Sequence, residues 1–136
     1  MHVLQLNSLT DTLAVSGQPA AADIAQLATR GFQVVVCNRP DGEEPGQPTM
    51  AEMEAATVAA GMTFMRYPVN PGNFPGDDLA GLAKIFQSGQ KVFAYCRTGT
   101  RCANLWVATR APELRAQAAD IARGLGFDLS LVSRLV

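Results

Sequence analysis

Short, mostly apolar runs bounded by polar or turn residues recur along the chain. Runs of this length that lack helical spacing are typical of strands buried on both faces. The pattern predicts strands over residues 3–6, 13–16, 32–37, 62–68 and 91–95. The run over 32–37 is rich in valine and is the best candidate for a central strand.

Between these runs, apolar residues recur at the three- and four-residue intervals of amphipathic helices. Thr49 and Glu52 have the spacing of a capping box, which satisfies unpaired amides at a helix start. The pattern predicts helices over about 20–30, from Thr49 to about residue 60, around 79–86, from just after Arg101 to Pro112, and around 114–125.

Strands and helices therefore alternate, which favours an α/β fold with a central, mostly parallel sheet flanked by helices. The chain has 136 residues, 48% of them hydrophobic, and shows no repeat or linker. This length and composition predict a single domain over 1–136.

Composition narrows the range of partners and cofactors. The net charge of −1 does not favour nucleic acid or an anionic membrane as a partner. The chain starts without an export signal or a membrane span, so we expect a cytoplasmic protein. The only histidine is His2 and there is no CxxC pair, so we expect no metal and no cofactor. The odd number of cysteines, three, favours free or reactive thiols.

The nearly neutral total hides a local asymmetry. Residues 79–112 contain bases and no acid, whereas residues 40–65 contain acids and no base. The basic stretch includes CRTGTR at 96–101, which joins the end of a predicted strand to the start of a predicted helix. Open α/β sheets bind their ligands at this kind of junction.

The residues of this loop suit the binding of an anion beside a nucleophile. A helix N-terminus attracts anions and lowers the pKa of a thiol, so Cys96 is predicted to be the nucleophile. Arg97 and Arg101 add cationic forks, and Gly99 allows the backbone to curl. We predict that Cys96 and Arg101 are catalytic and that Arg97, Thr98, Gly99 and Thr100 bind substrate. The alternative is a buried structural cysteine beside solvated arginines.

The loop resembles two known active sites. CRTGTR is similar to the C-R-x-G-x-R loop of single-domain rhodaneses and to a shortened form of the protein tyrosine phosphatase signature H-C-x-x-G-x-x-R-S/T. SGQP at 16–19, CNRPDGEEPGQP at 37–48, YPVNPG at 67–72 and YCRTGTRC at 95–102 resemble the bacterial beta-lactamase-hydrolase-like family. The resemblance covers about residues 12–130. It implies a protein tyrosine phosphatase-like fold, a rhodanese-type loop and a functional link to persulfide dioxygenases.

Three departures from the phosphatase pattern favour sulfur transfer over phosphate hydrolysis. The spacing is Cys-x4-Arg where phosphatases have Cys-x5-Arg, which predicts a smaller cradle. Tyr95 precedes the nucleophile in place of histidine. Asn70 stands where phosphatases of this fold carry an aspartic general acid, and no spacing argument selects Asp41, Asp77 or Asp78 as its substitute.

We therefore predict a rhodanese-type sulfurtransferase. In this prediction Cys96 takes the sulfane sulfur of thiosulfate or a persulfide and passes it to a thiol, sulfite or cyanide acceptor. Sulfite leaves without protonation, so no general acid is required. The alternatives are a cysteine-dependent phosphatase of the tyrosine or dual-specificity type, and a sensor that binds an anion or persulfide without turnover.

Three further residues are candidates for the site. Arg39 follows a parallel strand and is predicted to bind the substrate anion, or alternatively to pair with Asp41 or Glu43. Cys37 is interpreted as a core residue. Cys102 directly follows Arg101, and we predict either a resolving thiol for Cys96 or a buried packing residue.

Overall fold

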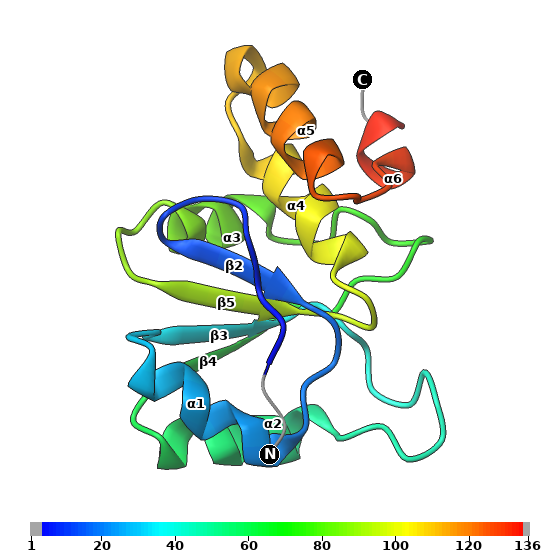
Figure 1. Ribbon diagram of the computed structural model, residues 1–136. Coiled ribbons are helices and arrows are strands. Elements are labelled where there is room, and N and C mark those ends of the chain that lie inside the picture. The colour runs from blue at the N-terminus through cyan, green and yellow to red at the C-terminus, as the bar shows by residue number, and fades with distance from the viewer. Residues whose placement is uncertain (1–3, 135–136) are drawn as a thin grey trace.

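The computed structural model describes residues 4–134 and contains a five-stranded sheet (Figure 1). The strand order is β1-β2-β5-β3-β4, and all neighbouring pairs are parallel except β1 and β2. The strands are β1 (Asn7–Ser8), β2 (Leu13–Ser16), β3 (Val34–Cys37), β4 (Thr63–Arg66) and β5 (Val92–Tyr95). The predicted α/β class with a mostly parallel sheet is confirmed.

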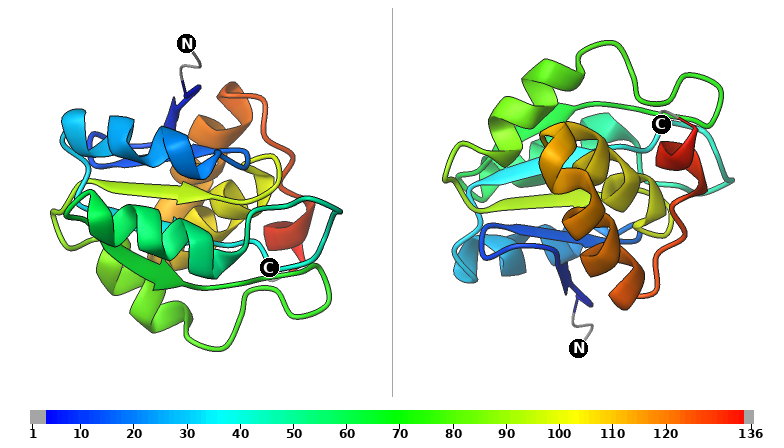
Figure 2. Two further views of the ribbon diagram at one scale, coloured as in Figure 1. Left: turned by 90° about the horizontal axis from the view of Figure 1, so that it is seen from below. Right: turned by 90° about the horizontal axis from the view of Figure 1, so that it is seen from above.

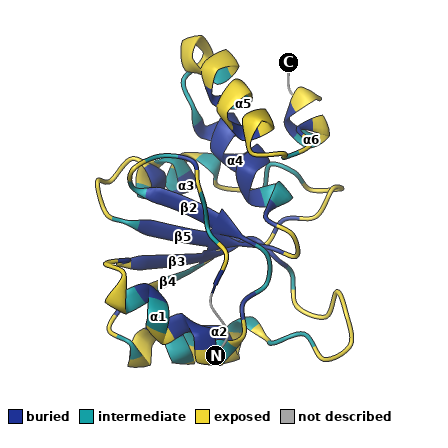
Figure 3. Cartoon of the chain, viewed as in Figure 1, coloured by how far each residue is buried: buried dark blue, intermediate teal, exposed yellow. Residues whose placement is uncertain are grey.

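The register of the three central strands brings their carboxyl ends together. Tyr95, the last residue of β5, lies beside Ser16 of β2 on one side and Cys37 of β3 on the other. Every residue of these three strands is buried, as Figure 3 shows by colour. The segments that follow the three strands therefore start at the same edge of the sheet.

Helices cover both faces of the sheet (Figure 1). The chain forms η1 (Ala21–Asp23), α1 (Ile24–Thr29), α2 (Met50–Ala59), α3 (Leu79–Phe86), α4 (Thr100–Thr109), η2 (Pro112–Leu114), α5 (Arg115–Gly124) and α6 (Ser130–Ser133). Helices α1 and α2 lie on one face, and α3 and α4 lie on the other, with α5 and α6 outside α4. None of the helices in the described residues is long and apolar enough to cross a membrane.

Each face of the sheet has its own apolar core. Phe93 and Tyr95 point toward α1 and α2, where their rings stack with centroids 6.1 Å apart. Val92 and Ala94 belong to the opposite core, which α4 fills with a continuous set of buried residues. Alternate residues of β5 thus anchor both layers, so the position at which this strand ends is firmly held.

The predicted elements differ from the structure at both ends of the chain. Residue 3 lies outside the described part, and 4–6 form no strand; the first strand is the short antiparallel β1. Leu4 is nevertheless buried, because it packs in the core beside α1 and α2. Helix α4 starts at Thr100, just before the predicted start, and α6 was not predicted. The capping box is present as predicted, with Glu52 N–H donating to the Thr49 hydroxyl.

Candidate active site

The loop that follows β5 makes a tight turn into α4. Cys96 comes directly after the strand, and Gly99 is the N-cap of the helix with φ of 89°. This left-handed conformation strains any residue with a Cβ, so glycine is required there. Gly17 contacts the same turn, since a Cβ on it would lie 2.9 Å from the Arg97 carbonyl oxygen. Residues 17–18, which follow β2, therefore support the loop from the side.

The Cys96 sulfur is the acceptor at the centre of this turn. Its side chain is buried, and the Gly99 N–H donates to the sulfur at 3.0 Å. The Cys102 thiol and the backbone amides of Cys102, Thr98 and Arg101 also stabilise the negative charge on this sulfur. The Cys102 thiol contributes most, and together these donors outweigh burial and lower the pKa of Cys96 to about 5. Cys96 is therefore a thiolate at neutral pH.

The Arg101 guanidinium is held in a fixed orientation near this thiolate. Its Nη1 and Nη2 donate to the two Glu43 carboxylate oxygens at 2.7 and 2.8 Å, and Nη1 also donates to the Val69 carbonyl at 2.8 Å. Among the described residues, Nε–H has no partner. The edge of the guanidinium formed by Nε and Nη2 thus has donors left for an anion.

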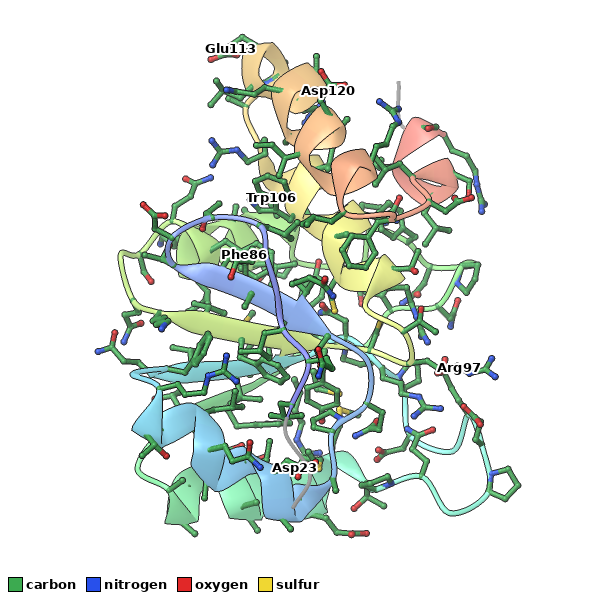
Figure 4. The ribbon with its side chains drawn as sticks, viewed as in Figure 1. Asp23, Phe86, Arg97, Trp106, Glu113 and Asp120 are labelled. Carbon is green, nitrogen blue, oxygen red and sulfur yellow. The ribbon has the colours of Figure 1, made fainter. Side chains whose placement is uncertain are left out.

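The acidic loop over 38–48 bridges the arginines of the site. Arg39 is 3% exposed and donates to Glu43 at 3.0 Å, to Glu44 at 2.7 Å and to Gln18 at 3.1 Å. Glu44 also pairs with Arg97 at 2.8 Å, although the Arg97 side chain is 62% exposed. Figure 4 shows the Arg97 side chain extending outward beside this loop.

An open cavity of about 540 Å³ lies above the loop. It is lined by Glu43, Glu44, Pro71, Arg97, Thr98, Thr100 and Arg101. These residues come from the segments after β3, β4 and β5, which Figure 2 shows at the same end of the sheet in both views. Pro71 is the one lining residue without a polar side chain; the other six bring charged or hydroxyl groups to the cavity, together with the aliphatic parts of their side chains.

The structure gathers most of the predicted site residues and moves one away. Arg97, Thr98, Thr100 and Arg101 line the cavity, and Gly99 shapes the turn beneath it. Arg39 does not line the cavity, because its guanidinium is committed to Glu43, Glu44 and Gln18. The predicted pairing of Arg39 with Glu43 is present, whereas Asp41 accepts from the Met50 amide at the start of α2.

Sequence reasoning missed the carboxylates of the cavity wall. In the sequence-based prediction Glu43 is only an alternative partner of Arg39, and neither Glu43 nor Glu44 is assigned to the site. The available signal was their place in a long loop after the central strand, opposite a basic loop of unlike charge. The side-chain hydrogen bond from Arg101 is the main cause that lowers the pKa of Glu43, so this carboxyl is ionised at neutral pH.

The remaining thiols are buried. Cys37 donates to the Arg39 carbonyl oxygen at 3.2 Å, and burial raises its pKa. Cys102 lies in the first turn of α4 and is fully buried, and burial raises its pKa as well. At neutral pH both are therefore thiols beside the Cys96 thiolate.

The site has a cysteine thiolate at the end of a central parallel strand, loop amides around it and an arginine at the following helix start, on a protein tyrosine phosphatase-like α/β fold. The family described as "Beta-lactamase hydrolase-like protein, phosphatase-like domain" matches residues 5–113. The chain belongs to this family, as its sequence resemblance predicted.

Curated relatives extend well beyond this chain. The Beta-lactamase hydrolase-like protein of Agrobacterium fabrum is 38% identical over 130 residues, which are 93% of this chain and 30% of the relative. The protein of the same description from Xylella fastidiosa strain Temecula1 is 28% identical, with the same coverage. The chain thus spans about 30% of the length of these relatives.

Solved structures confirm the phosphatase-like fold. A "putative phosphatase" from Neisseria meningitidis is 34% identical, covers 94% of each chain and superposes with a TM-score of 0.75. PTPMT1 is 18% identical and covers 96% of this chain and 91% of its own, with a TM-score of 0.70. Tk-PTP in the active form is 21% identical and covers 96% and 95%, with a TM-score of 0.66. At such low identity the last two show the fold alone.

The predicted rhodanese-type sulfurtransferase activity is wrong. The family is described as phosphatase-like, and the solved relative at 34% identity carries a phosphatase name. The sequence argument treated the short Cys-x4-Arg spacing as a loss of the phosphate cradle. In the structure the loop amides still converge on Cys96 below a wide cavity, so that argument fails. The link to a persulfide dioxygenase stays a prediction.

Proposed function

We propose that this protein is a cysteine-dependent phosphatase that hydrolyses phosphate monoesters through a phosphocysteine at Cys96. The observation that carries the proposal is the Cys96 thiolate, which lies among amide donors beside an arginine whose Nε–H has no partner among the described residues. Amides at a helix start and an arginine fork are complementary to the oxygens of a phosphoryl group.

Substrate binding uses donors that face the cavity. The Nε and Nη2 edge of Arg101 binds two phosphoryl oxygens, while Glu43 and Val69 hold the opposite edge in place. The loop amides bind the remaining charge. Arg97, exposed at the rim, attracts the anion into the cavity and gives up its pairing with Glu44 as the anion arrives.

The reaction proceeds in two displacements. The Cys96 thiolate attacks phosphorus, the S–P bond forms, and the bond from phosphorus to the leaving oxygen breaks. Water then attacks the phosphocysteine, which breaks the S–P bond, releases inorganic phosphate and restores the thiolate. Preorganised amides and Arg101 stabilise the charge of each transition state without reorganising.

Two similarities support the proposal. The family that matches most of the chain is described as phosphatase-like, and the Neisseria structure that aligns over 94% of the chain is described as a "putative phosphatase". The cavity also presents Arg97 and Arg101 together with the Thr98 and Thr100 side chains, which are groups that bind phosphoryl oxygens.

The test is hydrolysis of para-nitrophenyl phosphate by the purified chain, with phosphate release as a second readout. We expect turnover by the wild type, a transient gain of one phosphoryl group on Cys96 by mass after an acid quench, and neither result for Cys96→Ser. Cys37→Ser is the matched control, because it removes a neighbouring buried thiol that accepts no substrate. Phosphate binding with no turnover would instead identify an anion sensor and overturn the proposal.

A further inference from the structure

The cavity holds two carboxylates, and both accept hydrogen bonds from arginines. Glu43 accepts hydrogen bonds from Arg101 and from Arg39, and it is ionised at neutral pH. Glu44 uses one oxygen, Oε1, to accept from Arg39 at 2.7 Å and from Arg97 at 2.8 Å. In each contact the carboxylate is the acceptor of a charge-assisted hydrogen bond.

The other acidic residues near these loops serve the backbone or lie elsewhere. Asp41 accepts from an amide at the start of α2, and Asp78 does the same at the start of α3. Asp77 lines a separate cavity beside β4. Asn70 is an amide, and its Oδ1 accepts from two amides of its own turn at 2.8 and 3.0 Å. None of these four lines the cavity above Cys96.

We infer, on the basis of the proposed phosphatase function, that the leaving oxygen departs from this site without protonation by the enzyme. Its substrates are then phosphates carried on acidic leaving groups, such as acyl phosphates and phosphate esters of acidic phenols, and not alkyl phosphates. When the S–P bond to Cys96 forms, the P–O bond breaks and its electron pair stays on the leaving oxygen. That anion takes its proton from solvent after it has left.

The dependence of kcat/KM on the acidity of the leaving group tests whether the enzyme protonates the leaving oxygen. The substrates are para-nitrophenyl phosphate, phenyl phosphate, acetyl phosphate and glycerol phosphate, assayed by release of inorganic phosphate. A positioned general acid is worth about 10²–10⁴-fold, so we expect kcat/KM for glycerol phosphate to fall below that for para-nitrophenyl phosphate by at least this factor. Comparing kcat/KM for acetyl phosphate with kcat/KM for the two aryl esters distinguishes a preference for acyl phosphates from a preference for phenolic esters.

The results with alkyl and aryl phosphates separate a failure of the inference from a failure of the proposed phosphatase function. Similar kcat/KM for alkyl and para-nitrophenyl phosphates, with Glu44→Gln slowing only the alkyl ester, would overturn the inference and identify Glu44 as the acid. Glu54→Gln is the matched control, because Glu54 has similar exposure and pairs with Arg66 outside the cavity. Failure to hydrolyse any of the four phosphates would overturn the proposed function, and the inference with it.

A separate observation concerns the two thiols of the site. Cys102 is fully buried in the first turn of α4, directly after the loop that carries Cys96. Both side chains belong to the same core, on the α4 face of the sheet. The third cysteine, Cys37, belongs to the opposite core and donates to a backbone carbonyl. Of the other two thiols, Cys102 is thus the one that shares a core with the nucleophile.

We propose that Cys102 is a resolving thiol for Cys96. A hydroperoxide oxidises the Cys96 thiolate to a sulfenic acid. The sulfur takes the OH group of the hydroperoxide, the O–O bond breaks, and the other oxygen leaves with the electron pair as hydroxide or alkoxide. The Cys102 sulfur then attacks the Cys96 sulfur, the S–S bond forms and water leaves with the Cys102 proton. A dithiol reductant breaks this bond and restores both thiols.

The test is mild peroxide followed by dithiothreitol, read by peptide mass so that it is independent of catalytic activity. The wild type is expected to form a Cys96–Cys102 disulfide that dithiothreitol reverses, and Cys102→Ser to accumulate irreversibly oxidised Cys96. Cys102→Ala, checked by circular dichroism for its fold, repeats the measurement without a hydroxyl, and Cys37→Ser should behave as the wild type. Reduced Cys102 in the treated wild type, with full recovery of Cys96 in Cys102→Ser, would overturn the proposal.

Discussion

The two loops that form the cavity are held in different ways. The loop over 96–101 is short, starts from a central strand and is bound to its own cysteine by backbone amides. The loop over 38–48 is mostly exposed between 41 and 46, and its side chains reach the site through ion pairs with Arg39, Arg97 and Arg101. The nucleophile is therefore positioned by packed backbone, whereas the cavity wall is positioned by ion pairs between partly exposed side chains, which can exchange partners.

The largest effect should come from the arginine at which the two loops meet. Arg101→Lys keeps the charge and removes the fork, so we expect kcat/KM to fall by about 10²–10³-fold, the usual cost of a lost transition-state donor. Arg97→Lys is the matched comparison, because Arg97 is exposed and makes one ion pair. We expect Arg97→Lys to reduce kcat/KM by less. Equal losses would contradict the ranking of the two arginines.

Substitution of Gly99 should distort the loop over 96–101. Gly99→Ala places a Cβ at φ of 89° and 3.2 Å from Phe127 Cε1, so we expect a loss of about 1–2 kcal/mol in the free energy of unfolding, together with most of the activity. Gly89→Ala has a similar φ of 83° but open space around the new Cβ. It should lose similar stability in urea unfolding and keep its turnover. Full activity in Gly99→Ala would show that the turn tolerates distortion.

Substitution of Glu43 should weaken the attachment of the loop over 38–48 to Arg101. Because Arg101 lowers the pKa of Glu43 from its ordinary 4.5, the pair contributes stability above that pH and loses it as the pH falls through the lower, folded value. Glu43→Gln should lower the free energy of unfolding at neutral pH by about 0.5–1 kcal/mol, as for other partly exposed pairs. The variant should also weaken the acid dependence of unfolding measured between neutral pH and pH ~3. An unchanged acid limb would contradict the role of this pair.

The smallest effect expected is a shift of the Cys96 titration. The Cys102 thiol is the largest cause that lowers the pKa of Cys96 to about 5, so Cys102→Ala should move the thiolate absorbance transition to higher pH. Cys102→Ser retains a donor and should move it less. Turnover at neutral pH should change little in both variants, because the amides still favour the thiolate. Identical titrations of wild type and Cys102→Ala would show that the Cys102 thiol does not lower the pKa of Cys96.

The predicted elements were accurate where local patterns decide structure. The strand before Cys96, the capping box at Thr49 and the helix over 79–86 follow from apolar spacing and capping chemistry, and all three are present. The first strand was misplaced because an edge pairing of two residues has little apolar signal, while Leu4 is buried without being in a strand. A four-residue helix such as α6 is likewise too short for a periodic signal.

The sequence by itself determined the nucleophilic half of the site. Cys96, Gly99 and Arg101 lie within one turn, so their mutual geometry follows from a strand end, a left-handed glycine and a helix start, which are local properties of the backbone.

Only the tertiary structure decided the other half. Glu43 meets Arg101 across 58 positions of sequence because parallel β3 and β5 end in register, and no local pattern encodes that contact. The same contact leaves one guanidinium edge available to an anion. Charge pairs between loops depend on where the sheet places their ends, so their partners become visible only once the strands are paired.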